Sequence, residues 1–235
     1  MSFLLILPLT NCASNDMQWG NDIGTFPGSM EVLAHAASGD AAAAMDLIRL
    51  QWGYMLKHPN GTQSTFWEGY HKDGSWAYQT IYMSHAHGWA TGPAAALTHH
   101  VLGIQPAAAF DEEDGSETYN IKPSPAGQLS SCDGSLAWSD GRVQVDWEAD
   151  QAGFVTLHLD ASAQPTRSTA RVGLPLPAGL HADSVVVLAD GVLLPPDTDG
   201  DGASGLTLHG DSDSDGRVWI TVHEPRSLTL ALQLA

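Results

Sequence analysis

The sequence predicts an α+β chain in two regions, with helices up to residue 104 and an antiparallel β-sandwich from residue 105 to residue 235. Apolar residues recur with helical spacing through the first hundred residues. From about Gln105 that period gives way to short runs in which apolar and polar residues alternate, and turn formers separate these runs. A chain of 235 residues is long enough for both regions to share a sizeable buried core.

Two helices are expected to open the helical region as a hairpin. Pro27-Gly28-Ser29 reads as a stop followed by an N-cap, and the helix that follows carries Met30, Leu33, Ala34 and Ala37 on one face. Gly39 ends this helix and Asp40 caps the next. In the second helix apolar residues recur at helical spacing: Ala41, Ala44, Met45, Ile48, Trp52 and Met55. So short a connection predicts an αα-hairpin.

A third helix is expected from His87 or Gly88 to Leu102, ending at Gly103. Pro93 falls in its first turns, where a helix tolerates proline. The sandwich follows as the runs YNIKP, RVQVDW, FVTLHLD, ARVGLPL, SVVVLADGVLL, GLTLHG, RVWITVHE and SLTLALQLA. Even, short, alternating runs with Asp-Gly punctuation are typical of an antiparallel sandwich.

The charge of the chain excludes one large class of partner. There are 27 acidic residues against 9 Lys and Arg, a formal net charge of −18. Such a surface repels phosphate backbones, so nucleic-acid binding is not expected. No run approaches the roughly 20 apolar residues of a membrane span, so we expect no membrane partner.

The N-terminus gives no convincing signal peptide. The apolar stretch at residues 3–9 is short and no Lys or Arg precedes it, so we interpret it as a buried helix end or strand and leave the localisation open. Cys12 and Cys132 have no metal-like spacing. We favour two free thiols, although a disulfide between them stays possible from the sequence alone.

Two Asp-rich stretches resemble the start of a calcium loop. DTDGDG at 197–202 and DSDSDG at 211–216 place oxygens at alternate positions. The twelfth position, which should be a bidentate Glu, is Leu208 in the first and Val222 in the second. We therefore interpret both as solvated hairpin turns that bind calcium at most adventitiously, and we predict no metal site.

One carboxylate stands among aromatic rings. Glu68 lies in STFWEGY, and half of the chain's Phe, Trp and Tyr residues fall between residues 52 and 89, together with Asp73, His85 and His87. Rings, acids and imidazoles in loops that connect helices are what a sugar pocket needs. They are also what the packed end of a helical core shows, and the composition does not decide between the two.

Three motifs in order resemble a known family: GSMEVLAHAASGDAAAAMDLIRLQWGYML, then NGTQSTFWEGY, then SHAHGWATGPAAALTHHVLGIQP. This order resembles the end of the catalytic domain of α-L-rhamnosidases, especially fungal-type ones, and YNIKPSPAGQLSSCDGSLAWSDGRVQVDWEAD resembles their C-terminal β-domain. The resemblance implies that residues 1–104 are the last part of an (α/α)6 six-hairpin barrel and that residues 105–235 are the β-sandwich domain. It implies inverting hydrolysis of terminal α-L-rhamnose without a metal or another cofactor.

The resemblance also assigns residues. Glu68 matches the general base, which activates the attacking water. His87 matches a histidine that contacts the sugar, and His85 is the weaker candidate for that role. Trp67, next to the base, is either a stacking platform for the sugar or a core residue.

The chain departs from the family pattern in one respect. The general acid of the family lies in an upstream acidic motif, which these 235 residues do not contain. Asp73, five residues from Glu68, could be put forward as the acid, but nothing in the family pattern supports it. We expect a partner in the missing N-terminal part and a rhamnose-containing glycoside or polysaccharide as substrate. The alternatives are a non-catalytic carbohydrate-binding or vestigial module, and a structural module that docks on another chain.

Overall fold

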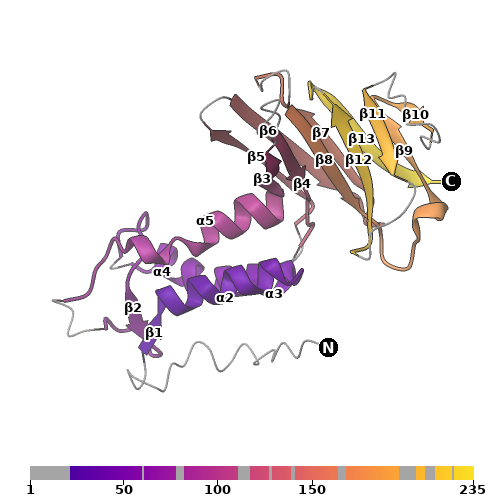
Figure 1. The fold of residues 1–235 in the computed structure, drawn as a ribbon. Coiled ribbons are helices and arrows are strands. Elements are labelled where there is room, and N and C mark those ends of the chain that lie inside the picture. The colour runs from indigo at the N-terminus through magenta and orange to yellow at the C-terminus, as the bar shows by residue number, and fades with distance from the viewer. Residues whose placement is uncertain are drawn as a thin grey trace, which may run out of the picture. The chain divides into compact units, whose positions relative to one another are not determined.

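The structure, a computed structural model, describes residues 22–59, 61–77, 82–110, 117–126, 129–138, 141–163, 168–195, 205–209, 215–223 and 225–235. The chain divides into two compact units, Met1–Ala96 and Leu97–Ala235. Within the described ranges, three helical segments come first and β-sheets follow (Figure 1), so the predicted α+β class is confirmed. Three helical segments do not by themselves establish an (α/α)6 barrel.

The predicted hairpin is confirmed, together with the helix end at Gly39 and the cap at Asp40. The elements are α2 (Thr25–Ala37), then α3 (Ala41–Leu47) continued by a π-helical turn (Ile48–Trp52) and by α4 (Gly53–Lys57). Gly39 ends α2 with a φ of +88°, in the left-handed region that suits glycine. Asp40 caps α3, since its carboxylate accepts a hydrogen bond from the Ala43 N–H at 3.0 Å.

The start of α2 differs from the prediction. The helix begins at Thr25 and Ser29 lies inside it, fully buried, instead of capping a helix at Met30. The Ser29 hydroxyl donates to the Trp89 carbonyl at 3.0 Å and accepts from the Gly92 N–H at 3.2 Å. Its hydrogen bonds therefore tie α2 to the start of the third helical segment, which is why Ser29 is not available as a cap.

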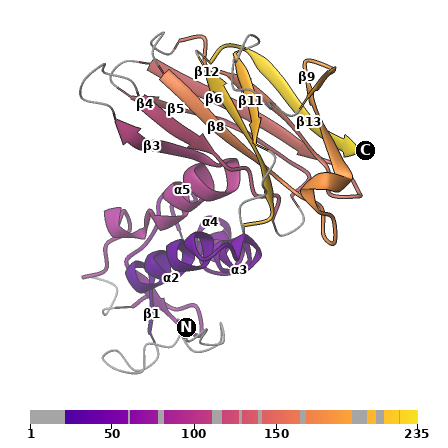
Figure 2. The same ribbon diagram turned by 45° about the vertical axis from the view of Figure 1, so that its right-hand side comes forward.

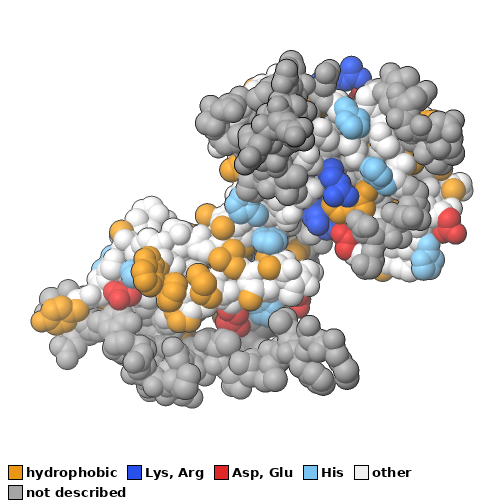
Figure 3. Space-filling model, viewed as in Figure 1, with side chains coloured by type: hydrophobic (Ala, Val, Ile, Leu, Met, Phe, Trp, Pro, Cys, Tyr) orange, Lys and Arg blue, Asp and Glu red, His pale blue; other side chains and the backbone are white. Residues whose placement is uncertain are grey.

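The buried face of α2 is also not the one with the larger apolar residues. The helix buries Thr25, Gly28, Ser29, Val32 and Ala36. The opposite stripe is exposed and apolar: Phe26, Met30, Ala34 and Ala37. Figure 3 shows hydrophobic side chains gathered on this face of the helical unit. Small residues on the buried side let neighbouring backbones approach closely, as a Cβ added at Gly92 would lie 2.5 Å from the Ser29 Cβ.

The third helical segment runs as a 3₁₀ turn (Gly88–Ala90), α5 (Gly92–Ala96) and a π-helical stretch (Leu97–Leu102), with Pro93 in its first turn as predicted. A small sheet completes the first unit. In it β1 (Asp22–Gly24) pairs antiparallel with β2 (Gly69–His71), so that Ile23 lies opposite Tyr70. The core of this unit is built around buried rings and thioethers, chiefly Trp52, Met55, Trp67, Tyr70 and Met83.

The second unit is a two-sheet sandwich (Figure 2). One sheet has six strands in the order β10 (Val192–Leu194), β9 (Val185–Ala189), β13 (Leu228–Leu234), β7 (Val155–Asp160), β6 (Gly141–Ala149), β5 (Ser131–Trp138). The other has five, in the order β11 (Leu206–His209), β12 (Arg217–His223), β8 (Ser168–Pro175), β4 (Glu117–Ile121), β3 (Ile104–Phe110). All eight alternating runs of the sequence form strands, and alternate positions are buried most clearly in the central strands, as Val155, Leu157 and Leu159 of β7 illustrate.

One pair of strands contradicts the prediction of a purely antiparallel sandwich. β4 runs parallel to β8, with Tyr119 opposite Ala170. Between them the chain crosses to the other sheet and forms β5, β6 and β7 before it returns. A hairpin forces its two strands to be antiparallel, whereas a long crossover of this kind permits a parallel pair.

The part of the chain that the structure describes contains no helix long and apolar enough to cross a membrane. The same residues contain no group of three or more His, Cys, Asp or Glu that could hold a metal ion. Cys132 on β5 is a free thiol. Cys12, the apolar N-terminal stretch, residues 197–202 and residues 211–214 lie outside the described residues, so the predictions made for them stay predictions.

The turn between the third helical segment and the sandwich depends on Gly103. Its φ is +95°, its N–H donates to the Thr98 carbonyl at 3.1 Å, and its carbonyl accepts from the Lys122 N–H at 2.9 Å. An added Cβ would lie 2.3 Å from the Lys122 carbonyl carbon and 2.6 Å from the Pro123 nitrogen. The position therefore excludes a side chain both by conformation and by space.

We expect Gly103→Ala to lower the free energy of unfolding by about 3 kcal/mol or more, because the left-handed φ costs roughly 1–2 kcal/mol and overpacking roughly 1–3 kcal/mol. The matched control is Gly179→Ala, where φ is +82° but nothing lies within 4 Å of the added Cβ, so only the backbone term of roughly 1–2 kcal/mol applies. Urea unfolding followed by circular dichroism measures both. Equal losses in the two variants would show that the close approach at Gly103 is absent.

Candidate functional site

Glu68 is held by two backbone segments. Its N–H donates to the Ser84 carbonyl at 2.9 Å, and the Ser84 N–H donates to its Oε2 at 3.2 Å. On the other side the Thr25 N–H donates to the Glu68 carbonyl at 3.1 Å. The side chain is half-buried, and among the described residues neither a cation nor any donor besides the Ser84 N–H engages its carboxylate. One carboxylate oxygen is thus anchored, while the other has no hydrogen-bond partner among the described residues.

Trp67 lies beside Glu68 in sequence but points into the core. Its exposed fraction is 0%, and its ring packs against Tyr54, Tyr70 and Trp76. The buried Thr25 hydroxyl donates to the Trp67 carbonyl at 2.6 Å and fixes the backbone there. Of the two roles considered for Trp67, stacking platform or core residue, this geometry fits the core residue, because a fully buried ring offers no face to a sugar.

The two predicted histidines lie on the segment that pairs with the Glu68 segment. The His87 N–H donates to the Phe66 carbonyl at 2.8 Å, and the His85 carbonyl accepts from the Thr65 hydroxyl. Both side chains are half-buried. The His85 ring lies 4.5 Å from the Trp76 ring, so it belongs to the edge of the aromatic core, whereas the His87 ring lies 6.4 Å from the exposed ring of Trp89.

An exposed aromatic pair next to His87 was not predicted from the sequence. Trp89 is 65% exposed and Phe26, on the first turn of α2, is 40% exposed. Their ring centroids are 4.6 Å apart with the planes inclined at 54°. Because Phe26 directly follows Thr25, which holds the Glu68 carbonyl, these rings lie near the same end of α2 as Glu68. The sequence shows that Phe26 and Trp89 are aromatic but not that they are exposed, so it gives little sign of this pair.

Asp73 is fully exposed and lies in a tight turn after β2. The hydroxyl and the N–H of Ser75 both donate to its Oδ1, at 2.6 Å and 2.9 Å. These hydrogen bonds hold the pKa of Asp73 below its ordinary value. A general acid for neutral pH needs its pKa raised instead, so Asp73 is poorly suited to protonate a leaving group.

A hollow of about 250 Å³ lies near Asp73 and is lined by residues of α3, α4 and β2, among them Leu47, Tyr54 and Tyr70. Glu68, His85 and His87 do not line it. The residues considered for the site are thus an anchored carboxylate, two half-buried imidazoles and an exposed aromatic pair. These groups can accept a proton and present an aromatic surface, and the carboxylate itself is the group that could activate a water.

The burial of the Tyr70 hydroxyl predicts a pH dependence of stability. Burial, and secondarily Tyr54, raise the pKa of Tyr70 above its ordinary value of about 10. Above pH 10 the unfolded chain loses this proton while the folded chain keeps it, so stability falls by up to about 1.4 kcal/mol per pH unit. We expect Tyr70→Phe to remove this contribution, so that its free energy of unfolding falls less steeply between pH 10 and 11.

Urea unfolding at pH 9, 10 and 11, followed by tryptophan fluorescence, measures the two slopes. The pKa of Tyr119 is also raised by burial, and this second contribution is present in both proteins and cancels in the comparison. The same slope in the wild type and in Tyr70→Phe would mean that the Tyr70 hydroxyl is not buried.

Comparisons with known proteins point to one family for part of the chain. Residues 103–187 match the bacterial α-L-rhamnosidase C-terminal domain. An α-L-rhamnosidase of Streptomyces avermitilis is 29% identical over 125 residues, which cover 53% of this chain and 11% of that protein. The structure of an α-L-rhamnosidase from Dictyoglumus thermophilum resembles this one with a TM-score of 0.63 and 18% identity, covering 89% of this chain and 21% of that one.

The sequence matches and the structural match support different conclusions. At 18% identity the structural match shows the fold alone. The chain spans about a tenth of the first relative and about a fifth of the second. It is thus similar to the C-terminal region of bacterial α-L-rhamnosidases, and the narrower resemblance to fungal-type enzymes has no support among these relatives.

Proposed function

We propose that this chain is the C-terminal part of an inverting α-L-rhamnosidase and that Glu68 is its general base. The observation that carries the proposal is the geometry of the Glu68 carboxylate, which is half-buried, anchored through Oε2 by the Ser84 N–H and, among the described residues, without a hydrogen-bond partner at its other oxygen. In inverting hydrolysis a carboxylate on the face opposite the leaving group takes a proton from the attacking water. An anchored side chain presents that oxygen in one fixed position.

The groups around Glu68 suit a sugar. His87 donates or accepts hydrogen bonds toward the hydroxyls of a terminal rhamnose, and His85 has the lesser role because its ring packs at the edge of the aromatic core. Trp89 takes the stacking role in place of Trp67, since its ring is exposed beside His87. The substrate is accordingly a rhamnose-containing glycoside or polysaccharide.

The general acid comes from another part of the enzyme. Inversion needs two carboxylates in opposite roles, about 6.5–9.5 Å apart. Asp73 does not fit the second role, because Ser75 holds its pKa low. In the relatives most of the polypeptide has no counterpart in this chain, which leaves ample room for an acid there.

The same proposal accounts for the apolar stripe on α2. Residues 1–104 form the last part of an (α/α)6 barrel, in which other helices of the enzyme cover the exposed Phe26 and Met30. Large exposed apolar surfaces on soluble proteins usually mark such contacts. Residues 105–235 form the sandwich domain that follows the barrel.

We expect Glu68→Gln, made in the enzyme that contains this chain, to lower kcat on a chromogenic α-L-rhamnoside by about 10²–10⁴-fold, the usual size of a general acid–base contribution. The amide keeps the shape of the side chain and the Ser84 hydrogen bond but cannot take a proton. The low-pH limb of the kcat/KM profile should disappear with it. Asp73→Asn is the matched control and should leave kcat unchanged.

A Glu68→Gln enzyme with the wild-type rate would refute the assignment of the base. Loss of activity in Asp73→Asn, with Glu68→Gln unaffected, would transfer the catalytic role to Asp73.

The 235 residues on their own should hydrolyse rhamnosides hardly at all, because no positioned acid protonates the leaving oxygen. Adding the remaining part of the enzyme, in one chain or as a separately expressed partner, should restore turnover. The assay compares the chain alone with the reconstituted protein on the same chromogenic α-L-rhamnoside. Robust turnover by the chain alone would contradict the proposed division of the two carboxylates.

A further inference from the structure

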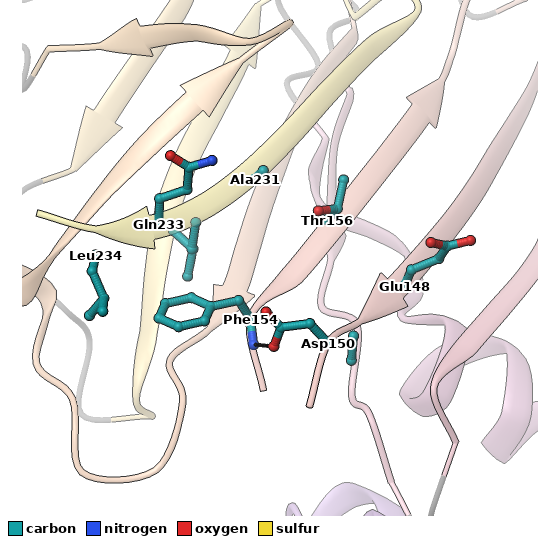
Figure 4. Close-up of a pocket in the computed structure, with 9 residues that line it drawn as sticks. Glu148, Asp150, Phe154, Thr156, Ala231, Gln233 and Leu234 are labelled. Carbon is teal, nitrogen blue, oxygen red and sulfur yellow. Dashed lines mark hydrogen bonds between the residues drawn. The ribbon is translucent and has the colours of Figure 1, made fainter. Parts of the chain in front are cut away.

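A second hollow, of about 410 Å³, opens on the six-stranded sheet of the sandwich where β6, β7 and β13 meet (Figure 4). β13 pairs with β7 only as far as Ala231, which lies opposite Thr156, and then continues to Leu234 beside β9 alone. Thr156 in turn lies opposite Glu148 of β6. The sheet thus lacks a strand beside the end of β13, and the side chains around this gap line the hollow.

The ring of Phe154 lies between the other residues that line the hollow. Figure 4 shows its ring reaching from the turn before β7 toward Gln233 and Leu234, with Thr156 and Glu148 on the other side. The ring is half-buried. It therefore offers an aromatic surface on the floor of a depression that also has polar walls.

The turn fixes the backbone that carries the Phe154 ring. Asp150 Oδ1 accepts from the N–H groups of Ala152 and Phe154, both at 2.9 Å, and the Asp150 N–H donates to the Phe154 carbonyl at 3.0 Å. Gly153, with a φ of +89°, allows the chain to close so tightly. The backbone position of Phe154 is therefore fixed before a ligand arrives, and such preorganisation favours binding.

Three polar side chains around the ring are open to a ligand. Glu148, Thr156 and Gln233 are exposed, and within the described part of the chain no hydrogen bond or ion pair engages them. They supply a carboxylate, a hydroxyl and a carboxamide, which together donate and accept. Asp150 differs from them because the turn already uses one of its oxygens.

The chemistry of the lining selects the ligand. Glu148, Asp150 and the net charge of −18 disfavour an anion. A purely apolar molecule would leave the polar walls without partners, whereas a sugar ring has an apolar C–H face and a rim of hydroxyls. The volume of about 410 Å³ lies within the range of roughly 300–1,000 Å³ usual for small-molecule sites.

We propose that the hollow around Phe154 binds a neutral carbohydrate, with one face of a sugar ring on Phe154 and its hydroxyls held by Glu148, Thr156 and Gln233. This site lies wholly in the sandwich and uses no residue of the site around Glu68. It is therefore a non-catalytic site, and it stands or falls independently of the proposed hydrolase function.

The test is a titration of the ¹⁵N-labelled 235-residue chain, followed by amide shifts, with methyl α-L-rhamnoside, methyl α-D-glucoside and methyl β-D-galactoside. We expect saturable shifts with at least one sugar, confined in the sandwich to the turn around Asp150, the start of β7 and the end of β13. Phe154→Ala should weaken binding at least tenfold, while Phe154→Tyr, which keeps the ring, should bind as the wild type does. Gln233→Ala should weaken binding several-fold without any change to the turn.

Two controls separate this site from others. Leu193→Ala removes an exposed apolar side chain on β10 of the same sheet and should leave the affinity unchanged. Glu68→Gln should also leave these shifts unchanged, so a failure of the hydrolase proposal would not affect the result.

Absence of saturable shifts with all three sugars would overturn the proposal, as would shifts at the hollow that persist with equal affinity in both Phe154→Ala and Gln233→Ala. Saturation by a lysine-containing tripeptide, and not by the sugars, would instead identify the hollow as a peptide site and would equally overturn it.

Discussion

The backbone hydrogen bonds of the Trp67–Glu68 segment are the constraint on which the candidate site depends. The Trp67 ring is sealed in the core, while the Glu68 side chain next to it is half-buried. The buried Thr25 hydroxyl and the Ser84 backbone hold this short segment from its two sides. The aromatic cluster is therefore structural, and it anchors the short segment that carries the Glu68 carboxylate.

A second constraint lies in α2, which approaches the third helical segment with its small residues. The contact of Ser29 with Gly92 leaves no room for larger side chains, and the large apolar residues are consequently displaced to the opposite face. The exposed stripe with Phe26 and Met30 is the kind of apolar surface that another part of a protein usually covers. The proposal of a barrel completed by other helices of the enzyme follows from this imbalance.

The sequence predicted the elements with strong periodicity and missed those without it. The eight alternating runs all form strands. β3 contains Pro106 and three alanines and carries no apolar alternation, whereas in β5 the alternation of Cys132, Leu136 and Trp138 is interrupted by Gly134. The N-terminus of α2 was misplaced because Ser29 looks like a cap and acts as an interhelical tie. The parallel pairing of β4 and β8 depends on contacts between segments far apart in sequence, which no local pattern reveals. At the candidate site the family motif pointed to Glu68 and His87. The exposure of Trp89 and the burial of Trp67 depend on three-dimensional packing, which the sequence does not show.

The proposed role of Glu68 requires a sugar that His87 and Trp89 hold beside its carboxylate. A crystal structure of the enzyme that carries this chain, with L-rhamnose bound, tests it most directly. The second carboxylate oxygen of Glu68 should then lie within reach of a water beside the anomeric carbon, with His87 at hydrogen-bond distance from a hydroxyl, the Trp89 ring against the sugar and Trp67 still sealed in the core. A rhamnose bound elsewhere, or a Glu68 side chain turned away from it, would refute the role of Glu68 as the general base.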